Sequence, residues 1–375
     1  MNNALTNSLF SDRTSINPNV GINKNKDKLS YGVYLGTAIT NIKYKSDYLN
    51  VKNEISKKYF FPSIESYLNI TISKKLSLYF NYDFETQFPL ADQILSVTNS
   101  ADALNTFTGN PDLDPEKKHS LYFNFNRYDF QTQSGFFIYT GMNFSENNIV
   151  SSTTFDSSLK RNTTYANVSN TFTSYFGFSL SKTIKKGKNS FKYRTGISMN
   201  LSKDKGFSDA QLFEANKISF SPNISFTYSL GEILTVNPSY NFTYTENSFK
   251  NYLIDKTTNV THNINLETTS YFPKHFVVGS DFGYNFNSNI ADGFKKDFYL
   301  WNVSLGYNFF KDKLLAKVKV YDALNQNQSN KTSFSPTNIT DELNTVLKRY
   351  VMFSLTYKIQ KFGGKEKPSG IEFFK

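Results

Sequence analysis

One stretch of the chain combines three carboxylates at alternate positions with two prolines: Gly109-Asn110-Pro111-Asp112-Leu113-Asp114-Pro115-Glu116. Carboxylate oxygens are the ligands that Ca²⁺ takes in proteins, so Asp112, Asp114 and Glu116 are candidate cation ligands, although their spacing is not that of an EF-hand. Proline fixes the backbone, and a rigid turn between strands is the alternative interpretation. We favour the turn, which makes this stretch a loop motif without a metal.

The three histidines and the catalytic motifs do not indicate an enzyme. His119, His262 and His275 fall on separate predicted strands or turns, with no second ligand at the spacing of a metal site. The sequence has no cysteine, which excludes thiolate ligands and a Cys nucleophile. It also contains no Gly-x-Ser-x-Gly, Walker or His-Glu-x-x-His motif. We therefore expect neither catalytic activity nor a cofactor.

A second group of polar side chains lies in the middle of segments in which apolar and polar residues alternate. The group consists of Asn81, Asp83, Lys192, Arg194, Asn223, Asn241, Asp281 and Asn285. Charged side chains at such positions need water on their side of a sheet. We expect these residues to line a solute path through the lumen of a barrel. The alternative is that they hydrate the wall and hydrogen-bond to a plug domain.

The clearest of these alternating segments form a hairpin, residues 218–228 and 234–245. Its even positions are apolar or aromatic, and its odd positions are Ser, Thr or Asn. Side chains alternate across a strand, so each arm has one apolar and one polar face. Each arm is also about as long as a tilted membrane-spanning strand of ~9–11 residues. Gly231 suits the short turn between the arms.

The same alternation predicts about fifteen strands along the chain. They are centred on residues 15–23, 31–39, 62–72, 76–84, 121–125, 136–144, 172–180, 191–201, 218–228, 234–245, 260–266, 276–286, 299–309, 314–320 and 351–359. The prolines on the apolar phase are expected at bulges or strand ends, because proline cannot donate to a ladder: Pro18, Pro62, Pro222 and Pro238.

The predicted connections alternate in length. Short turns are expected near residues 24–28, 73–75, 129–134, 184–190, 229–233, 272–275 and 310–313. Longer polar loops are expected near residues 45–56, 85–117, 145–160, 202–216, 246–257, 287–297 and 322–347. Turns that are short on one side and long on the other are typical of an up-and-down outer-membrane barrel.

The composition of the 375 residues agrees with a membrane barrel. Only 38% of the residues are hydrophobic but 17% are aromatic, with 37 Phe and 25 Tyr, which favours strands over helices. No apolar run approaches the ~18 residues of a membrane-spanning helix. The apolar faces often end in Tyr or Phe, as the aromatic girdles of membrane barrels do. The net charge of +11 is scattered, so we expect no nucleic-acid partner.

Three segments carry a resemblance to a known family: residues 84–90 (Phe-Glu-Thr-Gln-Phe-Pro-Leu), the loop motif at 109–116, and residues 349–357. Together they resemble the C-terminal barrel of TonB-dependent outer-membrane receptors, in the subgroup described as the outer membrane protein beta-barrel family. The likeness covers about residues 30–362. It implies a barrel of 22 strands with a plugged lumen, an N-terminal plug domain and a TonB box.

The resemblance also implies partners and an orientation. The implied partners are outer-membrane lipid, the plug domain, TonB and a surface lipoprotein, and the loop motif would be extracellular. The sequence lacks the plug, the TonB box and about seven strands, which predicts a fragment of a larger barrel.

We therefore predict an all-β fold, an antiparallel up-and-down transmembrane β-barrel with about 15 strands present of an expected 22. It would occupy residues 1–362, followed by a periplasmic C-terminal tail at 363–375. The predicted function is that of a receptor or transporter barrel segment for TonB-dependent solute uptake across the outer membrane of a Gram-negative bacterium. Two alternatives remain open: a structural or passive barrel without energy-coupled transport, and a soluble all-β binding or adhesion protein.

Overall fold

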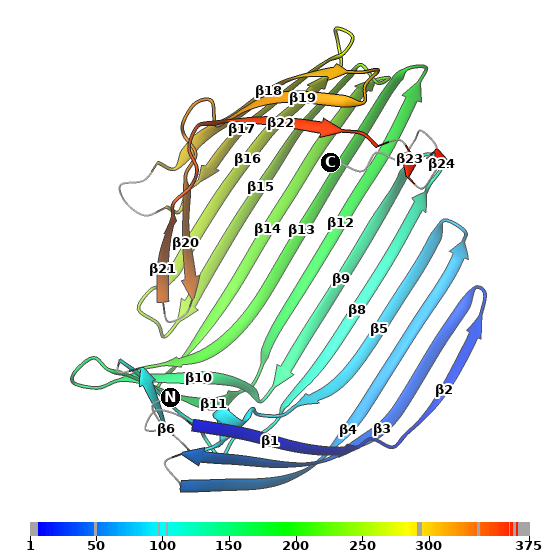
Figure 1. Ribbon diagram of the computed structural model, residues 1–375. Coiled ribbons are helices and arrows are strands. Elements are labelled where there is room, and N and C mark those ends of the chain that lie inside the picture. The colour runs from blue at the N-terminus through cyan, green and yellow to red at the C-terminus, as the bar shows by residue number, and fades with distance from the viewer. Residues whose placement is uncertain are drawn as a thin grey trace.

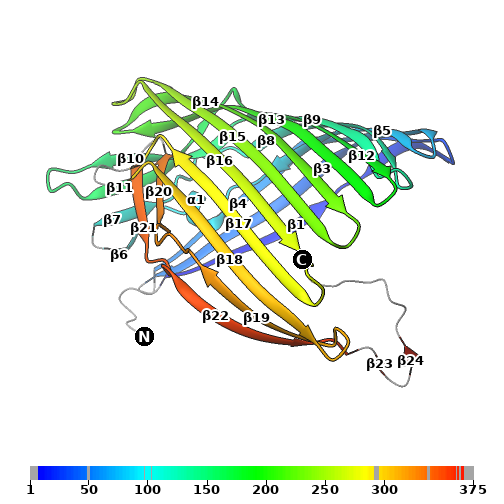
Figure 2. The same cartoon turned by 90° about the horizontal axis from the view of Figure 1, so that it is seen from above.

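One curved β-sheet of 20 strands accounts for most of the protein (Figure 1, Figure 2). The computed structural model describes residues 7–48, 51–96, 98–102, 104–290, 295–335, 338–359, 361–362 and 365–366. An antiparallel series crosses the sheet through β1 (Asn7–Ile16), β2 (Asn19–Lys26), β3 (Leu29–Tyr48), β4 (Val51–Ser73), β5 (Leu76–Gln87), β8 (Glu116–Asp129), β9 (Ser134–Glu146), β12 (Thr171–Lys186), β13 (Asn189–Ser208), β14 (Gln211–Leu230), β15 (Leu234–Lys250), β16 (Lys256–Ser270), β17 (Phe276–Asn287), β18 (Asp297–Phe309), β19 (Leu314–Tyr321) and β22 (Tyr350–Tyr357).

The first two strands of this series, β1 and β2, together occupy a single strand position beside β3. Both β1 and β2 pair with β3, one along each half of it, and the backbone N–H of Thr37 donates to the carbonyl oxygen of Pro18 at the break, at 3.0 Å. Counted this way the described series has fifteen members, as the alternation predicted. Pro18 lies at a strand end, also as predicted. Within the described residues no ladder joins β22 to β1 or β2.

The expectation of bulges or strand ends is wrong for the other prolines, Pro62, Pro222 and Pro238. Around Pro222 the register is the same on both sides, since Phe220 faces Tyr244 and Asn223 faces Asn241. A missing N–H removes one ladder bond but adds no residue, so the phase of the strand survives.

All seven predicted short turns are present. They connect consecutive strands at residues 27–28, 74–75, 130–133, 187–188, 231–233, 271–275 and 310–313. These turns gather at one end of the strands, the upper right of Figure 1, and the longer connections gather at the other.

Several predicted long loops are instead continued strands, and this part of the prediction is wrong. Residues 45–48 and 51–56 extend β3 and β4, and residues 202–216 form the ends of β13 and β14 with only Asp209 and Ala210 between them. Outside the apolar zone neither face of a hairpin has to be apolar, so the alternation fades while the backbone ladder continues. The hydrophobic pattern therefore marks the part of each strand that lies in the membrane zone and underestimates the full length of the strands.

The longer connections carry the remaining elements. A small sheet of β6 (Thr98–Asp102), β7 (Asn105–Thr108), β11 (Arg161–Val168) and β10 (Asn148–Phe155) joins the main sheet where β10 runs parallel to β13. The other elements are α1 (Ala91–Ile94) and the hairpins β20 (Ser329–Ser335) with β21 (Asn338–Asn344) and β23 (Lys361–Phe362) with β24 (Lys365–Glu366). Among the described residues no helix is long and apolar enough to cross a membrane. Apart from Lys365 and Glu366, the predicted tail at 363–375 lies outside the described residues.

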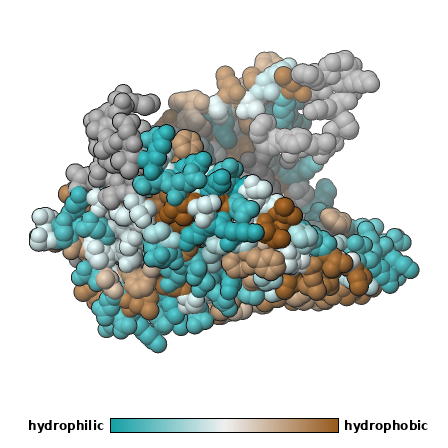
Figure 3. All heavy atoms as spheres, turned by 90° about the horizontal axis from the view of Figure 1, so that it is seen from below, coloured by the Kyte–Doolittle hydropathy of each residue, from teal (hydrophilic) through white to brown (hydrophobic). Residues whose placement is uncertain are grey.

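The apolar side chains keep one phase across the sheet and remain exposed on one of its faces. Ile138, Phe178 and Ile197 lie side by side on β9, β12 and β13, and Phe226 and Phe353 on this face are 50% and 78% exposed. From below, hydrophobic residues gather in patches bordered by hydrophilic ones (Figure 3). An apolar face of this extent would be unfavourable in water and suits contact with lipid.

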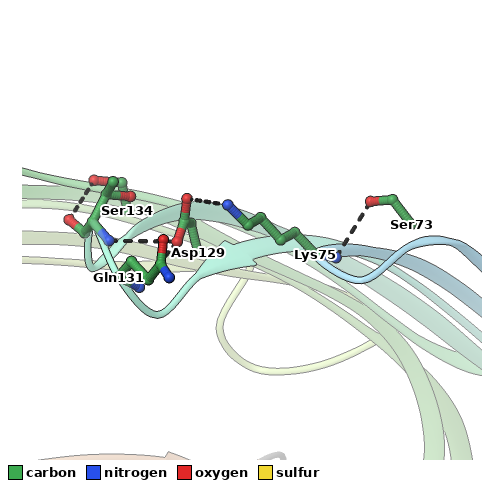
Figure 4. A network of polar contacts seen from close by, with 6 residues as sticks. Ser73, Lys75, Asp129, Gln131 and Ser134 are labelled. Atoms are coloured by element: carbon green, nitrogen blue, oxygen red, sulfur yellow. Dashed lines mark hydrogen bonds and ion pairs between the residues drawn. The ribbon is translucent and has the colours of Figure 1, made fainter.

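A polar network fixes one pair of short turns (Figure 4). Lys75, after β4, reaches across to Asp129 at the end of β8, with Nζ and Oδ2 2.6 Å apart. Asp129 Oδ1 also accepts the backbone N–H of Gln131 at 3.0 Å. The Lys75 hydrogen bond holds the pKa of the Asp129 carboxyl below its usual range. The pair ties two neighbouring turns together.

Candidate functional site

The helix α1 shows which face of the sheet is the inner one. Ile42 and Tyr44 of β3 are 3% and 1% exposed and pack against Ile94 and Leu95. The helix lies within the curve of the sheet (Figure 2), so even positions of β3 point inward. Directly paired residues share a face, and the register therefore carries this inner face from β3 to β22.

All eight residues predicted to line the lumen lie on this inner face. Asn81 and Asp83 lie on β5, opposite Tyr67 and Glu65 of β4. The other six lie on the continuous group β13 to β17: Lys192, Arg194, Asn223, Asn241, Asp281 and Asn285. Three strands, β8, β9 and β12, separate the two groups, so the prediction combined two parts of the wall.

Four asparagines form a row across four neighbouring strands. Asn223 faces Asn241, Asn241 faces Asn263, and Asn263 faces Asn285. The sequence prediction missed Asn263, although its position between His262 and Ile264 places it on the polar phase of β16. Neutral amides thus occupy one level of the inner wall along β14 to β17.

Carboxylates and further amides occupy the neighbouring level toward the short turns and bond to each other. Asp281 accepts a hydrogen bond from Nδ2 of Asn302 at 3.1 Å, and Asn237 Nδ2 donates to Glu267 at 3.3 Å. Glu267 and Asp281 face each other directly, so their carboxylates repel. Together with Lys192 and Arg194 on β13, these carboxylates give the inner wall both signs of charge.

On the other part of the inner wall, tyrosine rings cover glycines. Tyr139 lies over Gly177, and Tyr175 lies over Gly141, on the paired strands β9 and β12. The two rings are 6.2 Å apart between centroids. A Cβ on either glycine would overlap the ring, so each glycine makes the space that its tyrosine fills.

The loop motif at 109–116 folds against α1. Asn110 anchors it, since its backbone N–H donates to Gln93 O at 2.6 Å and its side-chain Nδ2 donates to Tyr165 O at 2.9 Å. Its Oδ1 also accepts the backbone N–H of Asp112 at 2.9 Å. At Gly109 a Cβ would overlap the carbonyl oxygen of Leu95, so only glycine fits there.

The second half of the motif is held by β11. Asn167 Oδ1 accepts the backbone N–H of Asp114 at 2.8 Å, and Asn167 Nδ2 donates to Asp114 O at 2.9 Å. Lys57 Nζ on β4 donates to Pro111 O at 2.6 Å, and Leu113 is buried at 1% exposure. The motif is a hydrogen-bonded turn, packed between the helix and two strands.

No cation site is assembled in the part of the chain that the structure describes. Nowhere in it do three His, Asp or Glu side chains come together to hold a metal ion. Asp112 and Asp114 are exposed, and Glu116, which follows Pro115 at the start of β8, faces Gln87.

The histidines have separate, non-metal partners. His119 and His262 lie on the outer face, and their Nδ1 atoms are 2.9 and 2.8 Å from the hydroxyls of Tyr82 and Tyr240. His275, in a short turn, lies 3.3 Å from Asp312.

Burial raises the pKa of two tyrosines that lie beneath the loop motif and outside the apolar zone. Burial raises the pKa of Tyr44, whose hydroxyl donates to Pro89 O at 2.9 Å. Burial, followed by the charge of Asp114, raises the pKa of Tyr59 to about 12. Both side chains stay neutral at physiological pH and act as packing groups.

A curved antiparallel sheet with an apolar outer face, a polar inner face and short turns at one end is that of an outer-membrane β-barrel protein. The sequence model of the outer membrane protein beta-barrel family matches residues 20–230 and 214–357, and the chain belongs to this family. Its location is accordingly the outer membrane of a Gram-negative bacterium.

Among solved structures, the chain is similar to the siderophore receptor PirA from Acinetobacter baumannii, at 11% identity and a TM-score of 0.32, over 94% of this chain and 60% of that chain. It is also similar to Pseudomonas aeruginosa OccK11 (OpdR), at 11% identity and a TM-score of 0.28, over 94% of this chain and 93% of that chain. The chain thus spans 60% of the length of the siderophore receptor. No curated protein sequence matches it significantly.

Proposed function

We propose that the chain forms the solute-lining wall of an outer-membrane receptor or transporter whose uptake depends on TonB. The observation that carries the proposal is the polar inner face, which runs from Asn81 and Asp83 on β5 to Asp281 and Asn285 on β17. The interior of a transmembrane barrel is polar where it encloses water or a plug, and in this proposal the same face is the surface that meets the solute.

The inward packing of the long connection after β5 supports a selective path. Residues 88–95 pack on the inner side of β1, β3 and β4, and the guanidinium of Arg13 lies 4.6 Å from the centre of the Phe88 ring. This segment narrows the space at the end that the proposal makes extracellular. The plug domain and TonB are the partners that the proposal requires, and a surface lipoprotein is an optional further partner.

A transport measurement in the native bacterium tests the proposal. Deleting the coding region should abolish uptake of at least one solute, and a protonophore should abolish the same uptake in the wild-type strain, because TonB transmits the proton-motive force. Replacing Asn81 and Asp83 by Ala should change the uptake rate without lowering the amount of protein in the outer membrane.

A passive barrel is the second candidate, favoured by the mixed charges on the wall. It predicts uptake that is lost on deletion but unchanged by the protonophore. That result would refute energy coupling, and uptake unaffected by deletion would refute a transport role altogether.

A further inference from the structure

The four-asparagine row belongs to a larger patch of side chains that have no protein partner. We define the amide patch as Asn223, Ser225, Ser239, Asn241, Asn263, Asn265 and Asn285. Ser225 faces Ser239, and Ser239 faces Asn265, so these three form a second row beside the asparagine row. Within the described structure none of the seven side chains forms a hydrogen bond with another protein group.

The levels on both sides of the patch behave differently. Toward the short turns, the hydroxyl of Thr227 donates to Asn237 at 3.0 Å, and Asn237 in turn donates to Glu267. Toward the long connections, Ser221 donates to Thr243 at 3.1 Å. The same residue types thus bond across strands above and below the patch but not within it. The lack of side-chain hydrogen bonds is therefore specific to the amide patch and does not follow from the residue types alone.

The patch is uncharged and extended. Neighbouring strands lie about 4.8 Å apart, so the asparagine row crosses roughly 14 Å from β14 to β17, which is longer than one sugar ring. Asn223 and Asn241 are exposed, and Asn263 and Asn285 are half-buried. Phe298 of β18 faces Asn285, so an aromatic ring ends the row on the inner face.

From this arrangement we propose that the amide patch binds a neutral oligosaccharide. An amide offers two N–H donors and a carbonyl acceptor, which together match neighbouring sugar hydroxyls that both donate and accept. The C–H face of a sugar packs on an aromatic ring, a role that Phe298 can take. The seven residues carry no charge, and the charges that border them, Arg194 opposite Ser225 and Glu267 next to Asn265 on the same face, have opposite signs and favour neither a cation nor an anion. The inference rests on the proposed function, because it names the class of solute that the wall would take.

Binding of defined hexasaccharides to the full chain, refolded in detergent micelles, tests the site. Isothermal titration calorimetry with maltohexaose, cellohexaose, xylohexaose and chitohexaose should detect binding of at least one. The N241A/N263A variant, changed at the centre of the row, should bind it at least tenfold more weakly. The N237A variant removes an amide from the same strand that is already bonded to Thr227 and Glu267, and its affinity should stay within twofold of wild type. Far-UV circular dichroism and heat-modifiable gel migration establish that each variant is folded.

Three results would overturn the inference: no binding of any of the four hexasaccharides, equal losses in N237A and N241A/N263A, or tighter binding of hexaglycine or hexaglutamate than of every saccharide. The measurement is separate from transport. Saccharide binding by a chain whose deletion leaves uptake unchanged would refute the proposed function and leave the site intact, and energy-coupled uptake without binding would do the opposite.

Discussion

Tyr139 and Gly177 face each other across β9 and β12, and the tyrosine ring occupies the space that a Cβ on Gly177 would need. Replacing Gly177 by Ala should therefore push the ring out of its position. We expect G177A to lower the free energy of unfolding by ~1–3 kcal/mol, the usual cost of overpacking. Urea-induced unfolding in detergent micelles measures the change.

A double-mutant cycle separates this contact from a general intolerance of alanine. In a Y139A background the ring is absent, so G177A should cost at least about 1 kcal/mol less than in the wild type. A change at the neighbouring inner position, S179A, serves as the control and should have little effect. Equal costs of G177A in both backgrounds would show that the ring does not depend on the glycine.

The two faces of the sheet predict an asymmetry between neighbouring residues. Phe282 lies on the outer face opposite Trp301, and Asp281 lies on the inner face. F282R should cost ~2–4 kcal/mol in lipid near the midplane of the membrane. D281R loses the bond from Asn302 but relieves the repulsion from Glu267, so its net cost should be small. Unfolding in lipid vesicles measures both, and equal effects would contradict the assignment of the faces.

The loop motif should open when Asn167 is shortened. N167A leaves the backbone N–H and carbonyl of Asp114 without their partners, and because Asp114 is exposed, each lost bond should cost ~0.5–1.5 kcal/mol, the net value of an ordinary hydrogen bond. Hydrogen exchange at the Asp114 amide should become faster, and protease should cut residues 109–116. N167D retains the acceptor and should preserve the Asp114 amide better than N167A does. Unchanged exchange in N167A would mean that packing of Leu113 alone holds the motif.

The turn pair Lys75–Asp129 should respond to acid. The pKa of Asp129 is lowered in the folded protein, chiefly by the hydrogen bond from Lys75. A lowered pKa means that the pair stabilises the turns above the unfolded value of ~3.9 and loses this effect as the pH falls through the folded value. In K75M, the carboxyl resonance of Asp129 should titrate at higher pH than in the wild type, by NMR. An unchanged titration would show that the backbone bonds alone lower the pKa.

The membrane zone was predictable because lipid imposes a strict rule on sequence. Residues 218–228 and 234–245 alternate without exception, and the structure keeps both in one ladder. The rule ends where lipid ends. Polar hairpins such as the ends of β13 and β14 carry no alternation, so their strands were predicted as loops. At Pro222 the sequence rule was too strict, because a strand tolerates a lost ladder bond without a bulge.

For the candidate site, the sequence predicted which face of the sheet each residue lies on, but not which residues of other strands lie next to it. Alternation placed Asn223 and Asn241 on the polar side, and the ladder makes them adjacent. Which residues of different strands lie at the same level depends on the register between strands, which turn lengths set only in part. For that reason Asn263 was missed, and the contact between Asn167 and the loop motif, which spans 53 residues, was out of reach.

The uninterrupted phase of the apolar face restricts how the gene for such a protein can change. A codon lost within the membrane zone of β14 would turn every later side chain of that strand to the opposite face, placing asparagines in lipid. Loss of two codons would restore the phase. Strand segments in the membrane zone should therefore vary among descendants by even numbers of residues, whereas the hairpin end at Asp209 and Ala210 can accept any number. The coding sequence therefore consists of two kinds of region: the membrane-zone strands, which do not tolerate single-residue insertions, and the hairpin ends, which do.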